Sequence, residues 1–156
     1  MRALVVTVST RAASGVYDDR GGRVAGDGLS GMDFEVDGPQ VVPDGDPVET
    51  ALRDAVSAEY DVVVTTGGTG LTPRDLTPEM TRRVIDREVP GVADAIRARG
   101  AEAGVLTAVL SRGIAGLAGT TLIVNLPGSP GGVRDGIGVL SGVLGHAVEQ
   151  AHGGDH

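Results

Sequence analysis

The chain has 156 residues, 40% of them hydrophobic, and a formal net charge of -8 at pH 7. A chain of this length can bury roughly two-thirds of its unfolded surface in one core, so we predict a single domain. The acidic balance argues against nucleic acids and anionic membranes as partners, because both are held largely by basic surfaces. No apolar run approaches the roughly 20 residues that a membrane-spanning helix needs.

Two absent amino acids exclude further mechanisms. The sequence has no cysteine, which excludes disulfides, thiolate metal sites and cysteine nucleophiles. All 13 basic residues are arginine, so the chain cannot form a lysine-dependent phosphate loop, a Schiff base or a lysine general base. The N-terminal segment has the pattern of a strand and not of a secretory leader. Together with the lack of cysteine, this pattern predicts a cytoplasmic protein.

The first third of the chain alternates between apolar and polar segments. Residues 3–8 form a continuous apolar run, which predicts a strand covered on both faces. Residues 9–22 are predicted to be a long polar loop, and residues 23–31 a weak helix, since each interior glycine costs about 1 kcal/mol. A second strand is predicted over residues 34–42. Asp46 then is predicted to cap an amphipathic helix that extends to Tyr60.

The remaining elements continue this alternation. Consecutive valines predict a third buried strand over residues 61–66. Thr77 is predicted to cap a helix with Pro78 at its first position, and Pro90 to begin another. The last segments are two apolar stretches, residues 105–110 and 121–124, and a final helix, residues 133–151.

Strands and helices in this order predict an α/β fold, a three-layer α/β/α sandwich with a mostly parallel sheet. We predict one domain over residues 1–151 and a short polar tail over residues 152–156. In such sheets ligands bind at the carboxyl ends of the strands. Three polar loops are expected there: residues 9–22, 65–78 and 125–132.

The loop TTGGTGLTPRDLTP, residues 65–78, follows a buried strand and precedes a helix. Gly67, Gly68 and Gly70 permit positive φ and a close approach of the backbone, and the helix at Thr77 presents free N–H groups. These features predict an anion site, whereas the alternative is a tight strand-to-helix turn. A dinucleotide fingerprint fits less well, because the segment lacks the third glycine of that motif.

Asp75 is placed where a carboxylate would repel an anion unless a cation lay between them. Mg²⁺ prefers one or two carboxylates together with substrate phosphate oxygens, and Asp44 also follows a strand end. We therefore predict Asp44 and Asp75 as ligands of Mg²⁺. For each aspartate alone, a role in a turn or a helix cap is the alternative.

Three arginines and one turn complete the candidate residues. Arg11, Arg74 and Arg134 flank the three loops and could compensate phosphate charge, although such side chains are often only solvated. In the turn NLPGSP, Asn125 and Ser129 could contact a ligand or bond the loop to itself.

Four segments together resemble the MogA/MoaB family of molybdenum cofactor biosynthesis, which is related to the N-terminal domain of gephyrin. They are SGVYDDRGG, VVPD, TTGGTGLTPRDLTPE and LSRGIAGLAGTTLIVNLPGSPGGV. The resemblance implies a molybdopterin adenylyltransferase that uses Mg²⁺ and ATP, releases pyrophosphate and passes its product to a molybdate-insertion protein. It also implies a homo-oligomer, either a trimer or a hexamer.

The resemblance assigns roles to residues of this chain. Asp44 and Asp75 fall on the two aspartates implicated in catalysis. The molybdopterin and nucleotide pocket would be lined by Gly67, Gly68, Thr69, Gly70, Ser111, Asn125, Pro127, Gly128, Ser129 and Pro130. The chain departs from the family pattern S-D-R at Thr10. A molybdopterin-binding or delivery protein without catalysis, and a nucleotide pyrophosphatase of the competence-damage type, are the alternatives.

Overall fold

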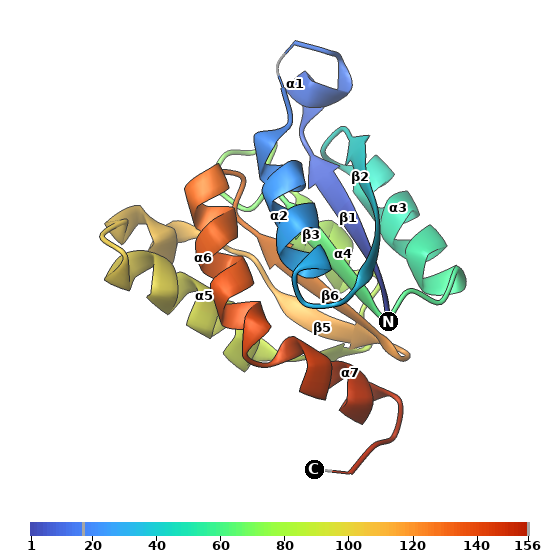
Figure 1. The fold of residues 1–156 in the computed structure, drawn as a ribbon. Helices are drawn as coiled ribbons and strands as arrows, with labels where there is room; N and C mark the ends of the chain where they lie inside the picture. The colour runs from blue at the N-terminus through green and yellow to red at the C-terminus, as the bar shows by residue number, and fades with distance from the viewer. Residues whose placement is uncertain (17, 156) are drawn as a thin grey trace.

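The computed structural model describes residues 1–16 and 18–155, and in it one six-stranded sheet lies between two layers of helices (Figure 1). The strand order is β2-β1-β3-β6-β5-β4. The strands are β1 Arg2–Val8, β2 Glu35–Val42, β3 Val62–Thr66, β4 Arg87–Glu88, β5 Ala115–Ala118 and β6 Thr121–Leu126. Strands β2, β1, β3 and β6 are parallel, whereas β5 and β4 pair antiparallel at one edge. The predicted α/β sandwich with a mostly parallel sheet is confirmed.

The helices cover both faces of the sheet. They are α1 Thr10–Ala13, α2 Arg20–Ser30, α3 Asp46–Ser57, α4 Thr77–Arg82, α5 Pro90–Glu102, α6 Pro130–Ser141 and α7 Leu144–Ala151, with a 3₁₀ helix, η1, at Leu106–Leu110. Helices α2, α5, α6 and α7 pack on one face, and α3 and α4 on the other. No helix in the described ranges is long and apolar enough to cross a membrane.

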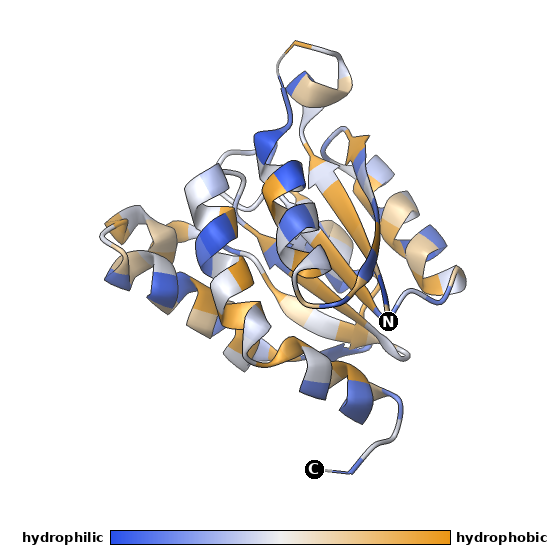
Figure 2. Ribbon diagram, viewed as in Figure 1, coloured by the Kyte–Doolittle hydropathy of each residue, from blue (hydrophilic) through white to orange (hydrophobic). Residues whose placement is uncertain are grey.

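Two apolar cores form because the central strands are buried on both sides (Figure 2). In β3, Val62 and Val64 face the α2, α5 and α6 layer, and Val63 faces α3 and α4. All five residues of β3 are buried, and so are all six of β6. Consecutive valines are therefore needed at these positions, because no side of the strand meets water.

The segment predicted as a loop, residues 9–22, is partly helical, so that prediction was wrong. Ser9 caps the short α1, and Asp19 caps α2 by accepting from the Gly22 amide at 2.9 Å. Helix α2 thus begins three residues earlier than expected. Gly21 is buried there, and a Cβ on it would lie 3.0 Å from the Gly128 carbonyl oxygen, so this glycine allows close packing. Tyr17 lies outside the described residues.

Two predicted helix caps were displaced by one residue. The N-cap position of α3 is Gly45 and that of α4 is Leu76, so Asp46 and Thr77 are the first helical residues. The Thr77 hydroxyl instead donates to the Gly67 carbonyl at 2.9 Å, which ties α4 to the glycine loop. Helix α3 ends at Ser57 and not at Tyr60.

The predicted final helix is two helices. Helix α6 begins at Pro130, capped by Ser129, and the chain breaks at Gly142 and Val143 before α7 starts. Beyond α7, His152 Nε2 lies 2.8 Å from Asp61 Oδ1, so the start of the predicted polar tail contacts the body of the protein.

Candidate active site

The carboxyl ends of β1, β3 and β6 bring the three polar loops to one edge of the sheet. Thr66 of β3 is in register with Thr7 of β1 and with Leu126 of β6. The Gly67 amide donates to the Leu126 carbonyl at 3.1 Å and joins the second loop to the third. The predicted site is therefore assembled from segments that are about 60 residues apart along the chain.

The glycine loop has the backbone geometry that only glycine adopts readily. Gly67 and Gly68 have φ of 89° and 68°, whereas Gly70 is not among the residues with positive φ. A Cβ on Gly68 would also meet the Thr77 hydroxyl and would lie 2.6 Å from Asp44 Oδ2. Two of the three glycines thus have the conformation expected from the sequence, and Gly68 brings the loop against Asp44.

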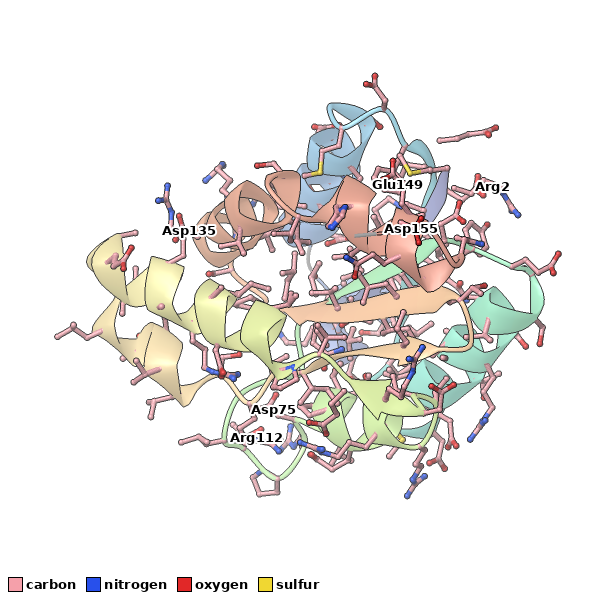
Figure 3. All side chains as sticks on the ribbon, turned by 90° about the horizontal axis from the view of Figure 1, so that it is seen from below. Arg2, Asp75, Arg112, Asp135, Glu149 and Asp155 are labelled. Carbon is pink, nitrogen blue, oxygen red and sulfur yellow. The ribbon has the colours of Figure 1, made fainter. Side chains whose placement is uncertain are left out.

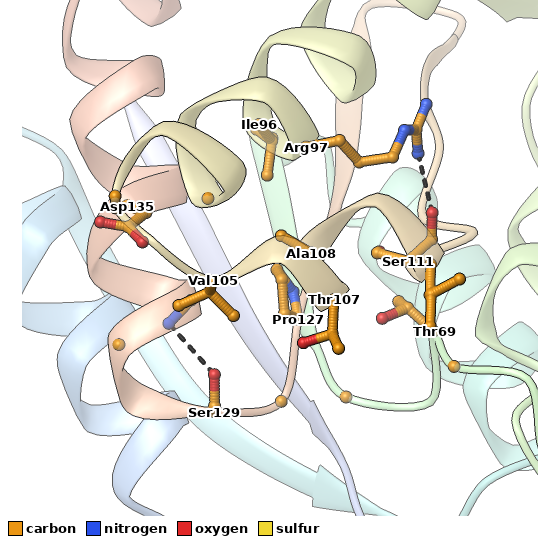
Figure 4. A pocket seen from close by; sticks show the side chains of 18 of the residues that line it. Thr69, Ile96, Arg97, Val105, Thr107, Ala108, Ser111, Pro127, Ser129 and Asp135 are labelled. Atoms are coloured by element: carbon orange, nitrogen blue, oxygen red, sulfur yellow. Dashed lines mark hydrogen bonds between the residues drawn. The ribbon is translucent and has the colours of Figure 1, made fainter.

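A cavity of about 810 Å³ opens beside this loop (Figure 4). The expected residues that line it are Gly67, Gly68, Thr69, Gly70, Asp75, Ser111, Pro127, Gly128 and Ser129. Asn125, Pro130, Asp44, Arg11 and Arg74 do not line it. Helix α5 and η1 supply a wall that the sequence did not reveal: Ile96, Arg97, Gly100, Ala103, Val105, Thr107, Ala108 and Leu110. Helix α6 adds Gly131, Gly132, Arg134 and Asp135.

Asp44 and Asp75 lie on either side of the glycine loop. Asp44 Oδ1 accepts from the amides of Gly45 and Leu76, at 2.7 and 3.1 Å. Asp75 Oδ2 accepts from the Thr72 amide at 3.0 Å and would lie 2.9 Å from a Cβ on Gly70. Each carboxylate uses one oxygen within the protein, so the other oxygen remains available to a ligand or a cation.

Burial raises the pKa of Asp44. The hydrogen bonds from the Gly45 and Leu76 amides lower this pKa, whereas the negative charges of Asp75 and Glu79 raise it further. Raising a carboxyl pKa means that its ionised form is penalised in the folded state. The stability that the protonated form contributes is therefore lost as pH rises through the pKa of folded Asp44. At neutral pH the carboxylates of Asp44, Asp75 and Glu79 outnumber the guanidinium of Arg112 beside them, so a bound cation would relieve the repulsion.

We expect Asp44→Asn to make the protein more resistant to urea at pH 7, because the amide keeps the Oδ1 acceptor without the charge. The difference from the wild type should shrink as pH falls and vanish below about 3.9, where the aspartate is protonated in both states. Urea unfolding from pH 3 to pH 8 measures this. Asp54→Asn, an exposed change on α3, is the control and should show no such rise.

Arg112, which the sequence did not single out, holds the glycine loop in place (Figure 3). Its guanidinium donates to the carbonyls of Gly70 and Asp75, at 2.8 and 2.6 Å, and to both carboxylate oxygens of Glu79. Its backbone amide donates to the Thr69 carbonyl at 2.8 Å. The bond to Glu79 raises the pKa of Arg112. Arg112 therefore fastens both ends of the segment that carries Asp75.

Asn125 is part of a buried network behind the cavity. Its Oδ1 accepts from the Ile114 amide at 3.2 Å, and its Nδ2 donates to the hydroxyls of Thr65 and Thr81, each at 3.0 Å. Thr65 and Thr81 have no exposed surface. The amide joins β6 to β3, to α4 and to the start of β5, so its place in this fold is structural.

We expect Asn125→Ala to lower the free energy of unfolding by about 3 kcal/mol, because it leaves buried polar groups unpaired and opens a small cavity. Urea unfolding monitored by circular dichroism measures the change. Ser141→Ala, which removes an exposed hydroxyl on α6, is the control and should change stability by less than about 0.5 kcal/mol. An equal effect of both substitutions would contradict this role of Asn125.

The helix N-terminus that faces the cavity is that of α6, not that of α4. Helix α4 has six residues, and the Leu76 amide at its start is taken by Asp44. At α6, the cap residue Ser129 and the next turn, with Gly131 and Arg134, line the cavity. The positive end of this 12-residue helix and one arginine therefore face the space where an anion could bind.

Thr10, where the chain departs from the family pattern S-D-R, lies beside Asp44. The Thr10 hydroxyl accepts from the Asp44 amide at 3.3 Å, a long hydrogen bond. Ser9, on its other side, caps α1. An aspartate in place of Thr10 would add a further negative charge next to Asp44, so the threonine leaves this end of the site less acidic.

Comparison with known proteins identifies the family. The model of the MoCF_biosynth family, described as a probable molybdopterin binding domain, matches residues 4–146. The chain belongs to this family. A solved structure described as MogA is 58% identical, with a TM-score of 0.92 over 97% of this chain and 99% of that one. The Mog protein of Mycobacterium ulcerans is 53% identical, with a TM-score of 0.92 over 96% and 98% of the two chains.

Curated relatives agree with this assignment but differ in length. The molybdopterin adenylyltransferase of Helicobacter pylori strain J99 is 37% identical over 84% of this chain and 76% of its own. The Drosophila melanogaster protein cinnamon, a molybdenum cofactor synthesis protein, is 43% identical over 69% of this chain. The match covers only 18% of that longer protein, so this family domain also occurs within larger chains.

Proposed function

We propose that this protein transfers the adenylyl group of ATP to molybdopterin and releases pyrophosphate, with Mg²⁺ as the required ion. A relative named molybdopterin adenylyltransferase is 37% identical to it, and the matched family is named for molybdopterin binding. The single observation that carries the proposal is the pair Asp44 and Asp75, on the two sides of a glycine loop that borders an 810 Å³ cavity.

The donor set at this loop fits Mg²⁺. Each of the two aspartates has one carboxylate oxygen free of protein hydrogen bonds, and burial, together with repulsion from Asp75, raises the pKa of Asp44. The described residues contain no group of three or more acidic or histidine side chains that could hold a metal. Mg²⁺ characteristically binds one or two carboxylates and takes its other ligands from water and substrate phosphates. When bound, it would neutralise charge on the phosphates.

In the proposed reaction a phosphate oxygen of molybdopterin forms a bond to the α-phosphorus of ATP, and the bond from that phosphorus to the bridging oxygen of pyrophosphate breaks. No protein nucleophile is needed, so the residues act by position and charge. The amides of the glycine loop and the α6 N-terminus at Ser129 border the cavity, and the phosphates would lie beside them. Asp75 lies in the loop that Arg112 holds in place, and its carboxylate would orient the reacting groups.

The test is to incubate the purified protein with molybdopterin and ATP and to measure pyrophosphate, with and without Mg²⁺. Pyrophosphate that requires both molybdopterin and Mg²⁺ is the expected result. Retention of molybdopterin without pyrophosphate would favour a binding or delivery protein. Hydrolysis of ADP-ribose in the absence of any pterin would favour a nucleotide pyrophosphatase.

We also propose that the protein is a homo-oligomer, a trimer or a hexamer, whose product passes to a molybdate-insertion protein. The side chains of Val105, Leu106, Val109 and Leu110 around η1 are 49–77% exposed, an apolar surface suited to contact with another chain. Light scattering of the purified protein gives the mass of the assembly. A monomer at micromolar concentration would contradict the proposal of an oligomer.

A further inference from the structure

The α6 end of the cavity carries two charged side chains that have no partner within residues 1–16 and 18–155, Arg134 and Asp135. The other charged residues that line the cavity are engaged. Arg97 donates to Asp94 and to the Gly113 carbonyl, at 2.9 and 2.8 Å, and Asp75 accepts from the Thr72 amide. Adjacent residues of a helix do not face each other, and within the described ranges Arg134 and Asp135 form no ion pair.

The surroundings of Asp135 suit a flat ring. Asp135 is half-buried and lies at the opposite end of the cavity from Thr69 and Ser111 (Figure 4). The wall that α5 and η1 contribute is mostly apolar; its apolar members are Ile96, Ala103, Val105, Ala108 and Leu110. Cavities of this kind bind rings against their apolar walls and fix them with a few polar groups.

A carboxylate restricts what can bind beside it. It accepts hydrogen bonds and donates none, so a ligand must present N–H or O–H groups to it. Its negative charge also repels phosphates, which favours an uncharged part of the ligand next to the carboxylate. An edge with two adjacent donors fits best, because both carboxylate oxygens can then accept in parallel.

We propose that Asp135 determines specificity for the pterin of molybdopterin by accepting hydrogen bonds from its ring N3–H and its 2-amino group. This inference rests on the proposed function and divides its site into two parts. The phosphate of molybdopterin then points from Asp135 toward the glycine loop and Asp75. Adenine fits this end less well, since its amino group lies beside an acceptor nitrogen that would face the carboxylate.

The test compares 6-hydroxymethylpterin with 6-hydroxymethyllumazine, which carries an oxygen in place of the 2-amino group. Fluorescence titration of each compound gives its dissociation constant. The wild type should bind the pterin about 10-fold more tightly than the lumazine. Asp135→Asn should weaken pterin binding about 10-fold and remove or reverse this preference, because the amide can donate to the 2-oxo group. Asp54→Asn should leave both constants unchanged.

Binding of ATP and of 2′-deoxy-ATP to the same variants tests whether the nucleotide, and not the pterin, lies at Asp135. Asp135→Asn should leave the affinity for both nucleotides within about 2-fold of wild type. An equal loss of ATP and pterin affinity would overturn the proposal, since it would place adenine or ribose at Asp135. Equal affinity of the wild type for pterin and lumazine, including no binding of either, would also overturn it. If pyrophosphate release still requires molybdopterin in either case, the proposed function stands without this subsite.

Discussion

Asp75→Asn is expected to lower the rate of molybdopterin-dependent pyrophosphate release by about 100-fold or more, the effect of losing one preorganised electrostatic group in an active site. The amide keeps an oxygen that can accept from the Thr72 amide, so the loop should keep its shape. What is lost is the negative charge, and with it one of the two carboxylates suited to Mg²⁺. The measurement is the initial rate of pyrophosphate release at saturating ATP.

Two controls separate this loss from a change of fold. Asp54→Asn removes an exposed aspartate on α3 and should leave the rate unchanged. Urea unfolding of Asp75→Asn should match that of the wild type within about 0.5 kcal/mol. If the variant stayed fully active, Asp75 would have no part in catalysis and the proposed magnesium site would lose one of its two ligands.

An element of the fold could be predicted where one segment of the sequence contains all the residues that indicate it. The valines of residues 61–66 indicate a strand covered on both faces, and β3 is buried throughout. Two helix starts also carry a local signal in the sequence. Asp19, three residues before Gly22, was available as the cap of α2, and Ser129 before Pro130 as the cap of α6. Strand β5 carries no such signal, because the short run Ala115–Ala118 includes a glycine.

The candidate site could be predicted only where its residues are contiguous in sequence. The glycine loop, Asp75 and residues 127–129 after β6 line the cavity, and the sequence points to them because strand ends mark that edge of a parallel sheet. The wall from α5 and η1 has an ordinary apolar sequence, and only the packing of these segments beside α6 makes it part of a cavity. Arg112 acts on residues 33 to 42 positions away, and no local pattern marks such a contact.

Arg112→Ala is expected to reduce pyrophosphate release about 100-fold and to lower the free energy of unfolding by about 2 kcal/mol. The substitution removes the donors to the Gly70 and Asp75 carbonyls and leaves Glu79 without its partner beside two aspartates. The loop then moves, and Asp75 moves with it. The fall should appear mainly in kcat, because the cavity wall on α5 and η1 is untouched.

The variant Arg112→Lys tests whether position or charge matters. Lysine keeps the positive charge near Glu79 but cannot donate to two carbonyls and a carboxylate at once, since it lacks the planar fork of the guanidinium. We expect it to restore most of the stability and little of the rate. Arg53→Ala removes a surface ion pair with Glu49 and should alter neither quantity by much. Full recovery of the rate by lysine would mean that Arg112 acts through its charge alone, because the hydrogen bonds that position Asp75 would then be dispensable.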